Sequence, residues 1–158
     1  MAKALVCYYS RTGNTEKMAL KIAEVLRSEG LDADLLKVED TPVDSLPEYD
    51  AVVLGTPVYY GTMAWPMKKF LDESVKFHRK LEGRVGAAFA SSMNVGGGNE
   101  TAVMDILKAL LIHGMVVQGE PRTDHYGPVS VGVPDERALK SCTAHGRTVA
   151  ALTRKLFG

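Results

Sequence analysis

The sequence predicts an α/β fold of three layers, with a parallel five-stranded sheet between two layers of helices. Short apolar runs alternate along the 158 residues with longer stretches of helical periodicity, and polar, glycine-containing loops follow several of these runs. No repeat, linker or low-complexity tract divides the chain. Strands that alternate with helices imply parallel pairing through right-handed crossovers. We therefore expect a single domain, residues 1–158, with the strand order 2-1-3-4-5.

Five runs have the character of buried strands. The first is rich in β-formers and ends at a polar loop, the second alternates, and the third is closed by Gly55. The five predicted strands cover residues 3–9, 31–38, 51–54, 84–90 and 115–118.

Four stretches repeat apolar residues with the spacing of a helix. Gly30 follows the first as a stop signal, Pro66 suits the first turn of the second, and His113-Gly114 caps the third. The predicted helices cover residues 13–29, 64–76, 99–113 and 135–157, and the prolines and glycines of 120–134 predict an irregular segment.

Composition excludes several classes of protein. With 46% apolar and 24% charged residues the chain is not intrinsically disordered. No apolar run approaches the ~18 residues of a membrane span, and the N-terminus is interpreted as a strand rather than a signal peptide. Nineteen basic and nineteen acidic residues cancel, so nucleic acid is not an expected partner. Cys7 and Cys142 form no C-x-x-C pair, which favours reduced thiols in a cytoplasmic protein.

The loop after the first strand has the composition of an anion site. Hydroxyl, amide and glycine residues stand at the start of a helix, where backbone N–H groups bind phosphate. A plain helix N-cap is the alternative. No Walker motif and no G-x-G-x-x-G fingerprint occurs in the chain. The loop consists of Ser10, Arg11, Thr12, Gly13, Asn14 and Thr15.

The loops after the third and fourth strands suit a flat ligand. The first, residues 55–63, has two adjacent tyrosines that could stack on a ring, although packing at the sheet edge would also explain them. The second, residues 91–99, has three glycines whose N–H groups can meet carbonyl acceptors, or it is a flexible surface loop. Together the three loops describe a ligand with a phosphate and a planar head, which FMN fits.

The strings S-R-T-G-N-T, G-T-P-V-Y-Y-G-T-M-A and G-G-G-N-E-T, followed by H-G-M, resemble the flavodoxin-like NAD(P)H:quinone oxidoreductases of the WrbA type. The similarity covers residues 3 to about 133. It implies a flavodoxin-like fold, non-covalent FMN, NAD(P)H as electron donor and a quinone as acceptor. It also implies that residues 10–15 hold the phosphate and that His113 lies near the active site as a candidate catalytic residue; a helix C-cap is the alternative for His113. The residues that would flank the flavin ring are Pro57, Val58, Tyr59, Tyr60, Gly61, Thr62, Met63, Ser91, Ser92, Met93, Asn94, Gly96, Gly97, Gly98 and Tyr126.

The chain departs from this family at the fifth strand. A longer insertion, which helps to assemble a tetramer, is reduced here to residues 121–125. The sequence therefore does not decide whether the chain forms a homo-oligomer, and the short segment makes the chain more similar to simple flavodoxins. Three functions remain: a two-electron reductase, a small electron carrier that docks on a redox partner protein, and a regulatory module with little turnover. The histidines at 78, 125 and 145 have no metal-like spacing, so no metal is expected. Trp65 lies either near the ring or under the second helix.

Overall fold

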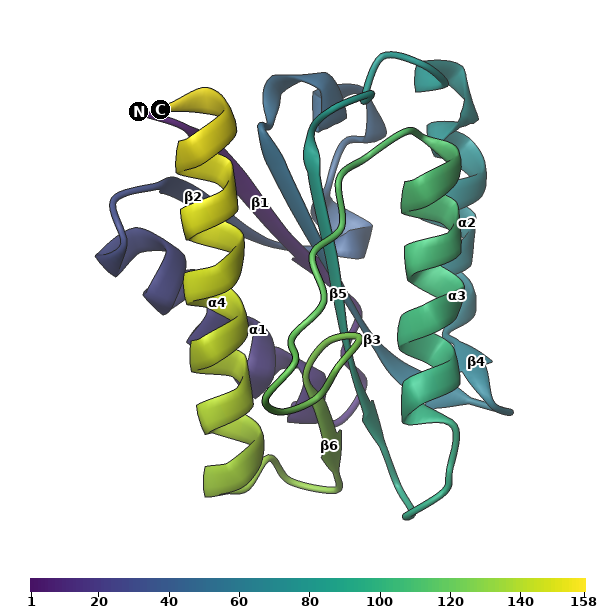
Figure 1. The fold of residues 1–158 in the computed structure, drawn as a ribbon. Helices are drawn as coiled ribbons and strands as arrows, with labels where there is room; N and C mark the ends of the chain where they lie inside the picture. Colours follow the sequence, from purple (N-terminus) through teal and green to yellow (C-terminus); the bar gives the residue numbers. More distant parts are fainter.

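The computed structural model describes residues 1–158 as a parallel sheet between two helical layers (Figure 1). The helices are α1 (Asn14–Ser28), α2 (Trp65–Glu73), α3 (Asn99–Ile112) and α4 (Glu136–Phe157). Short 3₁₀ turns cover Val38–Asp40, Val43–Glu48 and Ser74–Phe77. The strands are β1 (Lys3–Tyr8), β2 (Asp32–Lys37), β3 (Ala51–Tyr59), β4 (Thr62–Met63), β5 (Val85–Ser92) and β6 (Val129–Val131).

Five parallel strands run in the order β2-β1-β3-β5-β6, which confirms the predicted 2-1-3-4-5 order. A sixth strand, β4, pairs antiparallel with the end of β3 and lies off this path. The carboxyl ends of the parallel strands meet at the lower edge of the molecule in Figure 1, where the loops that carry the candidate site emerge.

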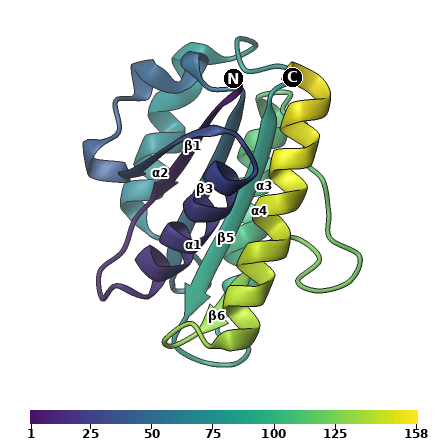
Figure 2. The same cartoon turned by 90° about the vertical axis from the view of Figure 1, so that its left-hand side faces the viewer.

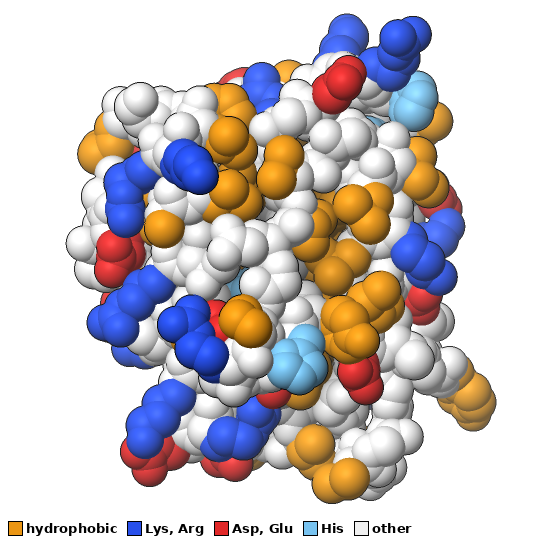
Figure 3. Space-filling view, in the orientation of Figure 1, with side chains coloured by type: hydrophobic (Ala, Val, Ile, Leu, Met, Phe, Trp, Pro, Cys, Tyr) orange, Lys and Arg blue, Asp and Glu red, His pale blue; other side chains and the backbone are white.

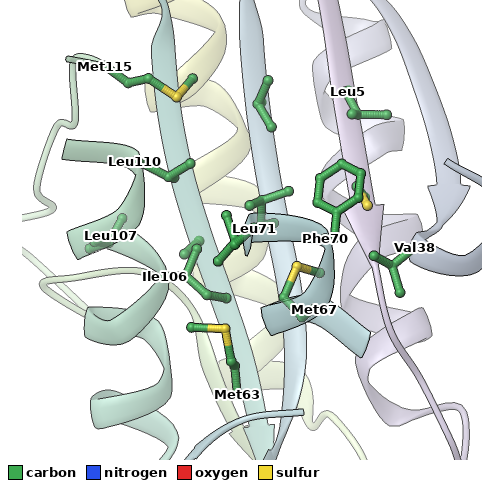
Figure 4. Packing of buried hydrophobic residues seen from close by; sticks show 14 of the residues in the cluster. Leu5, Val38, Met63, Met67, Phe70, Leu71, Ile106, Leu107, Leu110 and Met115 are labelled. Atoms are coloured by element: carbon green, nitrogen blue, oxygen red, sulfur yellow. The ribbon is translucent and has the colours of Figure 1, made fainter. Parts of the chain in front are cut away.

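Successive side chains of β1 point to opposite layers, as the period of a strand requires. Leu5 and Cys7 belong to the core beneath α2 and α3, whereas Ala4 and Val6 belong to the core beneath α1 and α4. Figure 2 shows α1 and α4 side by side over one face of the sheet. Figure 4 shows the opposite core, in which side chains of α2 and α3 meet those of the sheet.

The predicted fifth strand at 115–118 is wrong in its position. Only Val116 forms a bridge, with Val85 at the start of β5. The fifth place in the sheet is completed at the other end of β5 by Val129–Val131, within the segment predicted to be irregular. The chain leaves the sheet edge between these two points and returns through Pro128, whose carbonyl accepts a hydrogen bond from the Ala90 N–H at 3.0 Å.

The third strand is longer than predicted, because it continues through Gly55 to Tyr59. Its end folds back on Thr62–Met63 as a two-residue hairpin. Tyr60 and Gly61 both have positive φ, 49° and 81°, as the turn of a tight hairpin requires. The segment predicted as an open loop is therefore a hydrogen-bonded hairpin, whose register fixes where its two tyrosines lie.

His145 is a buried titratable group that links stability to pH. It lies in α4 with its Nε2 buried and without a hydrogen-bond partner. Burial lowers the pKa of His145 to about 4, although Glu120 and Asp124 face it and act in the opposite direction. As the pH falls, His145 is therefore protonated near pH 6.5 in the unfolded chain but only near pH 4 in the folded chain. Stability is complete above pH 6.5 and falls as the pH drops through this window.

We expect the free energy of unfolding to decrease by about 2 kcal/mol between pH 7 and pH 5 because of His145. In His145→Leu most of this decrease should disappear, leaving the part due to His113, whose pKa is also lowered by burial. Urea unfolding of the native protein and of His145→Leu at several pH values measures it. An unchanged pH profile in His145→Leu would contradict the assignment.

Candidate functional site

The loop after β1 is shaped as an anion cradle at the N-terminus of α1. The Ser10 Oγ accepts hydrogen bonds from the N–H groups of Gly13 and Glu16, at 3.1 and 3.3 Å. Gly13 has φ of 95°, which permits the tight entry into the helix. The N–H groups of Arg11 and Thr12 make no hydrogen bond within the chain. These free donors at a helix N-terminus fit the phosphate of a flavin mononucleotide.

Thr15 connects this loop to the third one. Its side chain is buried, and its Oγ1 lies 2.8 Å from the Oγ of Ser91 at the end of β5. Ser92 is buried next to it, where its Oγ donates to the Asn94 carbonyl and accepts from the Asn99 side-chain amide, both at 3.0 Å. Thr15, Ser91 and Ser92 therefore hold the two loops in place, and their hydroxyls are already engaged.

The hairpin and the third loop carry exposed apolar side chains toward the same edge. Tyr60 is fully exposed, Met93 is 86% exposed and Val95 is 90% exposed. Large apolar side chains grouped in this way at a loop cluster are typical of a ligand or partner site. Their exposure fits a planar ring held between the hairpin and the third loop. Met63, in contrast, is 7% exposed and belongs to the core beneath α2 and α3 (Figure 4).

Two residues outside the predicted set fasten the hairpin to α3. The Thr101 Oγ1 lies 2.6 Å from the Gly61 carbonyl and 2.9 Å from the Gly98 carbonyl. The Thr62 Oγ1 donates to Asp105 at 2.6 Å. The hydrogen bonds from Lys108 and Thr62 lower the pKa of Asp105. Thr101 and Asp105 are four residues apart and lie on one face of α3. No sequence motif indicates that this face contacts the hairpin at Gly61 and Thr62.

Glycine is needed where these loops touch. A Cβ on Gly98 would lie 2.7 Å from the Gly61 Cα, so the backbones of the hairpin and the third loop are in direct contact at this one point. Gly98 also has φ of 97°, and Gly96 has φ of 66°. Gly97 differs, because a Cβ there would meet the Asn94 carbonyl at 2.7 Å. The glycine run therefore permits a close approach as well as a turn.

Tyr126 lies beyond the third loop, against the start of α3. It is 44% exposed and lines a cavity of about 240 Å³ together with Asn99 and Glu100. Gly127 follows, and a Cβ on it would lie 2.1 Å from the Ala88 carbonyl, so the loop packs directly on β5. In Figure 2 this loop projects from the side of the molecule.

His113 is not among the residues that the structure gathers at the loop cluster. It is the C-cap of α3, whose fourteen residues separate it by about 20 Å from the third loop. Its Nε2 lies 2.8 Å from the Ser74 Oγ, and its buried Nδ1 has no partner. Burial, and then His78, lower its pKa. The helix-cap position is confirmed. The catalytic role of His113 stays a prediction, and His113 lines a cavity of about 710 Å³ together with Thr62 and Met63 of the hairpin.

Charge is distributed evenly around the site. The face in Figure 3 shows basic and acidic side chains interspersed, without a field of one sign. The hairpin and third loop contain no Asp or Glu. Glu100 follows the third loop directly at the start of α3, and Asp105, which meets the hairpin through Thr62, is paired with Lys108 at 2.6 Å. No group of His, Cys, Asp and Glu could hold a metal ion, and no helix has the length and apolar character needed to cross a bilayer.

Known proteins share this arrangement along nearly the whole chain. A flavodoxin of Clostridium saccharobutylicum is 33% identical over 98% of this chain and 99% of its own. An NAD(P)H dehydrogenase (quinone) of Archaeoglobus fulgidus is 32% identical over 99% of this chain and all of its own. The crystal structure of a WrbA-like flavodoxin from Agrobacterium tumefaciens superposes with a TM-score of 0.84 at 25% identity, covering 99% of each chain. Residues 5–127 match the flavodoxin domain, and the chain therefore belongs to the flavodoxin family.

Proposed function

We propose that this protein is an NAD(P)H:quinone oxidoreductase that uses non-covalent FMN. The observation that carries the proposal is the group of exposed, uncharged side chains on the hairpin and the third loop. Tyr60, Met93 and Val95 are exposed there, and neither the hairpin nor the third loop contains a carboxylate. A planar nicotinamide or quinone stacks favourably on such side chains, whereas a charged protein surface would find no charged partners there.

The chain's own residues bind and orient the cofactor in this proposal. Thr12 and the free N–H groups of Arg11 and Thr12 hold the phosphate, while the two tyrosines of the hairpin and the glycines of 96–98 border the ring. When bound, FMN supplies the redox chemistry, since it exchanges two electrons with a nicotinamide and with a quinone. The names of full-length relatives support the donor and the acceptor.

A flavodoxin-type electron carrier is the second candidate. Relatives named flavodoxin match the chain over almost its full length. The 121–125 segment is short, so a docked redox partner protein would approach the ring closely. The hairpin and the third loop, however, contain no acidic residue, and electrostatic steering of a cationic partner depends on an excess of negative charge near the flavin.

Rapid mixing of the FMN-loaded protein with NADH or NADPH decides between the two. The reductase requires fast bleaching of the flavin by one nucleotide and reoxidation by benzoquinone. The carrier would show no reduction by either nucleotide and a stable one-electron-reduced form during dithionite titration, which would refute the proposal.

The proposal also includes the domain organisation and the cellular compartment of the protein. Residues 1–158 act as one FMN-binding domain. Both cysteines are buried and unpaired, in separate cores, which suits a reducing cytoplasm. The catalytic role predicted for His113 is tested by the activity of His113→Gln, measured together with the oligomeric state.

Gly61 and Thr101 are expected to set the midpoint potential of the flavin. We expect the Gly61 peptide to lie beside the ring and to turn when the ring gains a proton. Thr101→Val removes the hydroxyl that holds the Gly61 carbonyl, so the peptide turns more freely and the potential rises. Gly61→Ala restricts a residue with positive φ, so the potential falls. Both shifts should be on the order of tens of millivolts, since 59 mV corresponds to a tenfold one-electron equilibrium.

Spectroelectrochemical titration measures these potentials. Thr143→Val is the matched control, because its hydroxyl binds the Leu139 carbonyl within α4. Potentials that stay unchanged in both site variants would remove Gly61 from the mechanism.

A further inference from the structure

A cavity of about 500 Å³ opens on the α2 side of the hairpin, outside the set of loops described above. Three elements form it: the end of β1, the end of β3 with its hairpin, and the first turns of α2. Its volume lies within the range of small-molecule pockets. The lining residues are Tyr9, Arg11, Tyr59, Met63, Ala64, Trp65 and Lys68.

The lining combines aromatic faces with positive charge. Trp65 is 74% exposed and Tyr59 is 38% exposed, so both present ring surface to a ligand. Arg11 forms no ion pair, and the cavity is lined by no carboxylate. Lys68 is held 2.6 Å from Asp72, which lies outside the cavity. Aromatic faces stack on planar rings, and guanidinium and ammonium groups bind phosphate oxygens.

The cavity adjoins the proposed flavin site through shared residues. Arg11 belongs to the 10–15 loop, and Tyr59 and Met63 belong to the hairpin. A ligand seated in the cavity is therefore separated from the flavin position by the hairpin strand alone. A nicotinamide must lie over the flavin to react, so the rest of a dinucleotide has to find a second place nearby.

We propose that this cavity binds the adenylate half of a nicotinamide dinucleotide, with the adenine against Trp65 and the phosphates toward Arg11 and Lys68. This inference rests on the proposed function, because it names where that reaction's donor is held. A quinone has no phosphate for the two cations, and it does not explain their presence.

The larger cavity between α2 and α3, about 710 Å³, is less suited to this ligand. Its cations Lys68 and Lys108 are both paired with aspartates that line the same cavity, at 2.6 Å each. No aromatic ring other than those of His78 and His113 borders it. Neither of these lysines is unpaired, whereas the cavity beside the hairpin has Arg11, which forms no ion pair.

Steady-state kinetics of the FMN-loaded protein test the proposal with Trp65→Ala, Trp65→Phe and Lys68→Gln. Stacking on an aromatic side chain is worth enough for Trp65→Ala to raise the KM for the nucleotide roughly tenfold. Trp65→Phe should restore most of the affinity, and Lys68→Gln should raise KM a few-fold. The value of kcat, the KM for benzoquinone and the FMN dissociation constant should stay unchanged.

Lys69→Gln is the matched control. Lys69 is the next residue of α2, forms the equivalent ion pair with Glu73 at 3.8 Å, and lies outside the cavity. An unchanged nucleotide KM in both Trp65→Ala and Lys68→Gln overturns the proposal while leaving the oxidoreductase intact. A loss of FMN affinity equal to the loss of nucleotide affinity also overturns it, since the cavity would then belong to the cofactor.

Direct binding of ADP-ribose, followed by calorimetry, separates this proposal from the proposed function. ADP-ribose contains the adenylate half without the nicotinamide. Binding that Trp65→Ala weakens roughly tenfold supports the cavity even if neither NADH nor NADPH reduces the flavin. Absence of ADP-ribose binding by the unmodified protein overturns the proposal, whatever the flavin does.

Discussion

Replacing Gly55 by alanine is expected to lower the free energy of unfolding by about 3 kcal/mol, as overpacking a core can. Gly55 lies in the middle of the sheet, opposite Tyr8 of β1 and Phe89 of β5. A Cβ on Gly55 would lie 2.0 Å from the Cζ of Phe89, whose side chain is fully buried. The ring cannot move away without displacing the core beneath α1 and α4. Urea unfolding of the variant measures the effect.

A double-mutant cycle with Phe89→Leu isolates this contact. The smaller leucine removes the clash, so Gly55→Ala should cost clearly less in the Phe89→Leu background than in the native one. Gly86→Ala is the comparison in the neighbouring strand, where a Cβ would come no closer than 3.2 Å to Leu110 and 3.3 Å to Met115, so its cost should be smaller. Additive effects of Gly55→Ala and Phe89→Leu would show that the ring is not the reason for the glycine.

Thr12→Ala is expected to weaken FMN binding by roughly tenfold to a hundredfold, since a charge-assisted hydrogen bond contributes about 1.5–3 kcal/mol. Thr12 is exposed in the cradle, unlike Thr15, whose hydroxyl is engaged with Ser91. Its loss removes a donor to the phosphate and leaves the fold of the loop, which Ser10 maintains, in place. Fluorescence titration of the flavin gives the dissociation constant.

Riboflavin, which lacks the phosphate, provides the internal comparison. Its affinity should hardly change in Thr12→Ala, and equal weakening of both ligands would show that this loop does not hold the phosphate. Ser28→Ala is the matched variant at the other end of α1, where the hydroxyl binds the Val25 carbonyl. It should leave both affinities unchanged.

Local signals predicted the loops better than the sheet edge. The 10–15 loop is recognisable because hydroxyl and glycine residues follow a buried strand directly. The Val129–Val131 strand is only three residues long and follows a proline, so it has too little periodicity to be seen. The hairpin was missed for another reason. Tyr60, in its turn, has a positive φ that a tyrosine rarely adopts, and the pairing of β3 with β4 on either side of the turn imposes this conformation.

The order of strands and helices, the family resemblance and the phosphate cradle follow from the sequence itself, because they depend on neighbours within a few residues. Contacts across the chain required the tertiary structure. Thr101 meets Gly61 over a separation of forty residues, and Gly55 accommodates Phe89 from another strand. The cavity beside the hairpin joins Arg11 and Trp65 in the same way. Side chains that meet only through sheet order and helix packing leave no local pattern, and for this reason His113 could be placed away from the loops only once α3 was oriented.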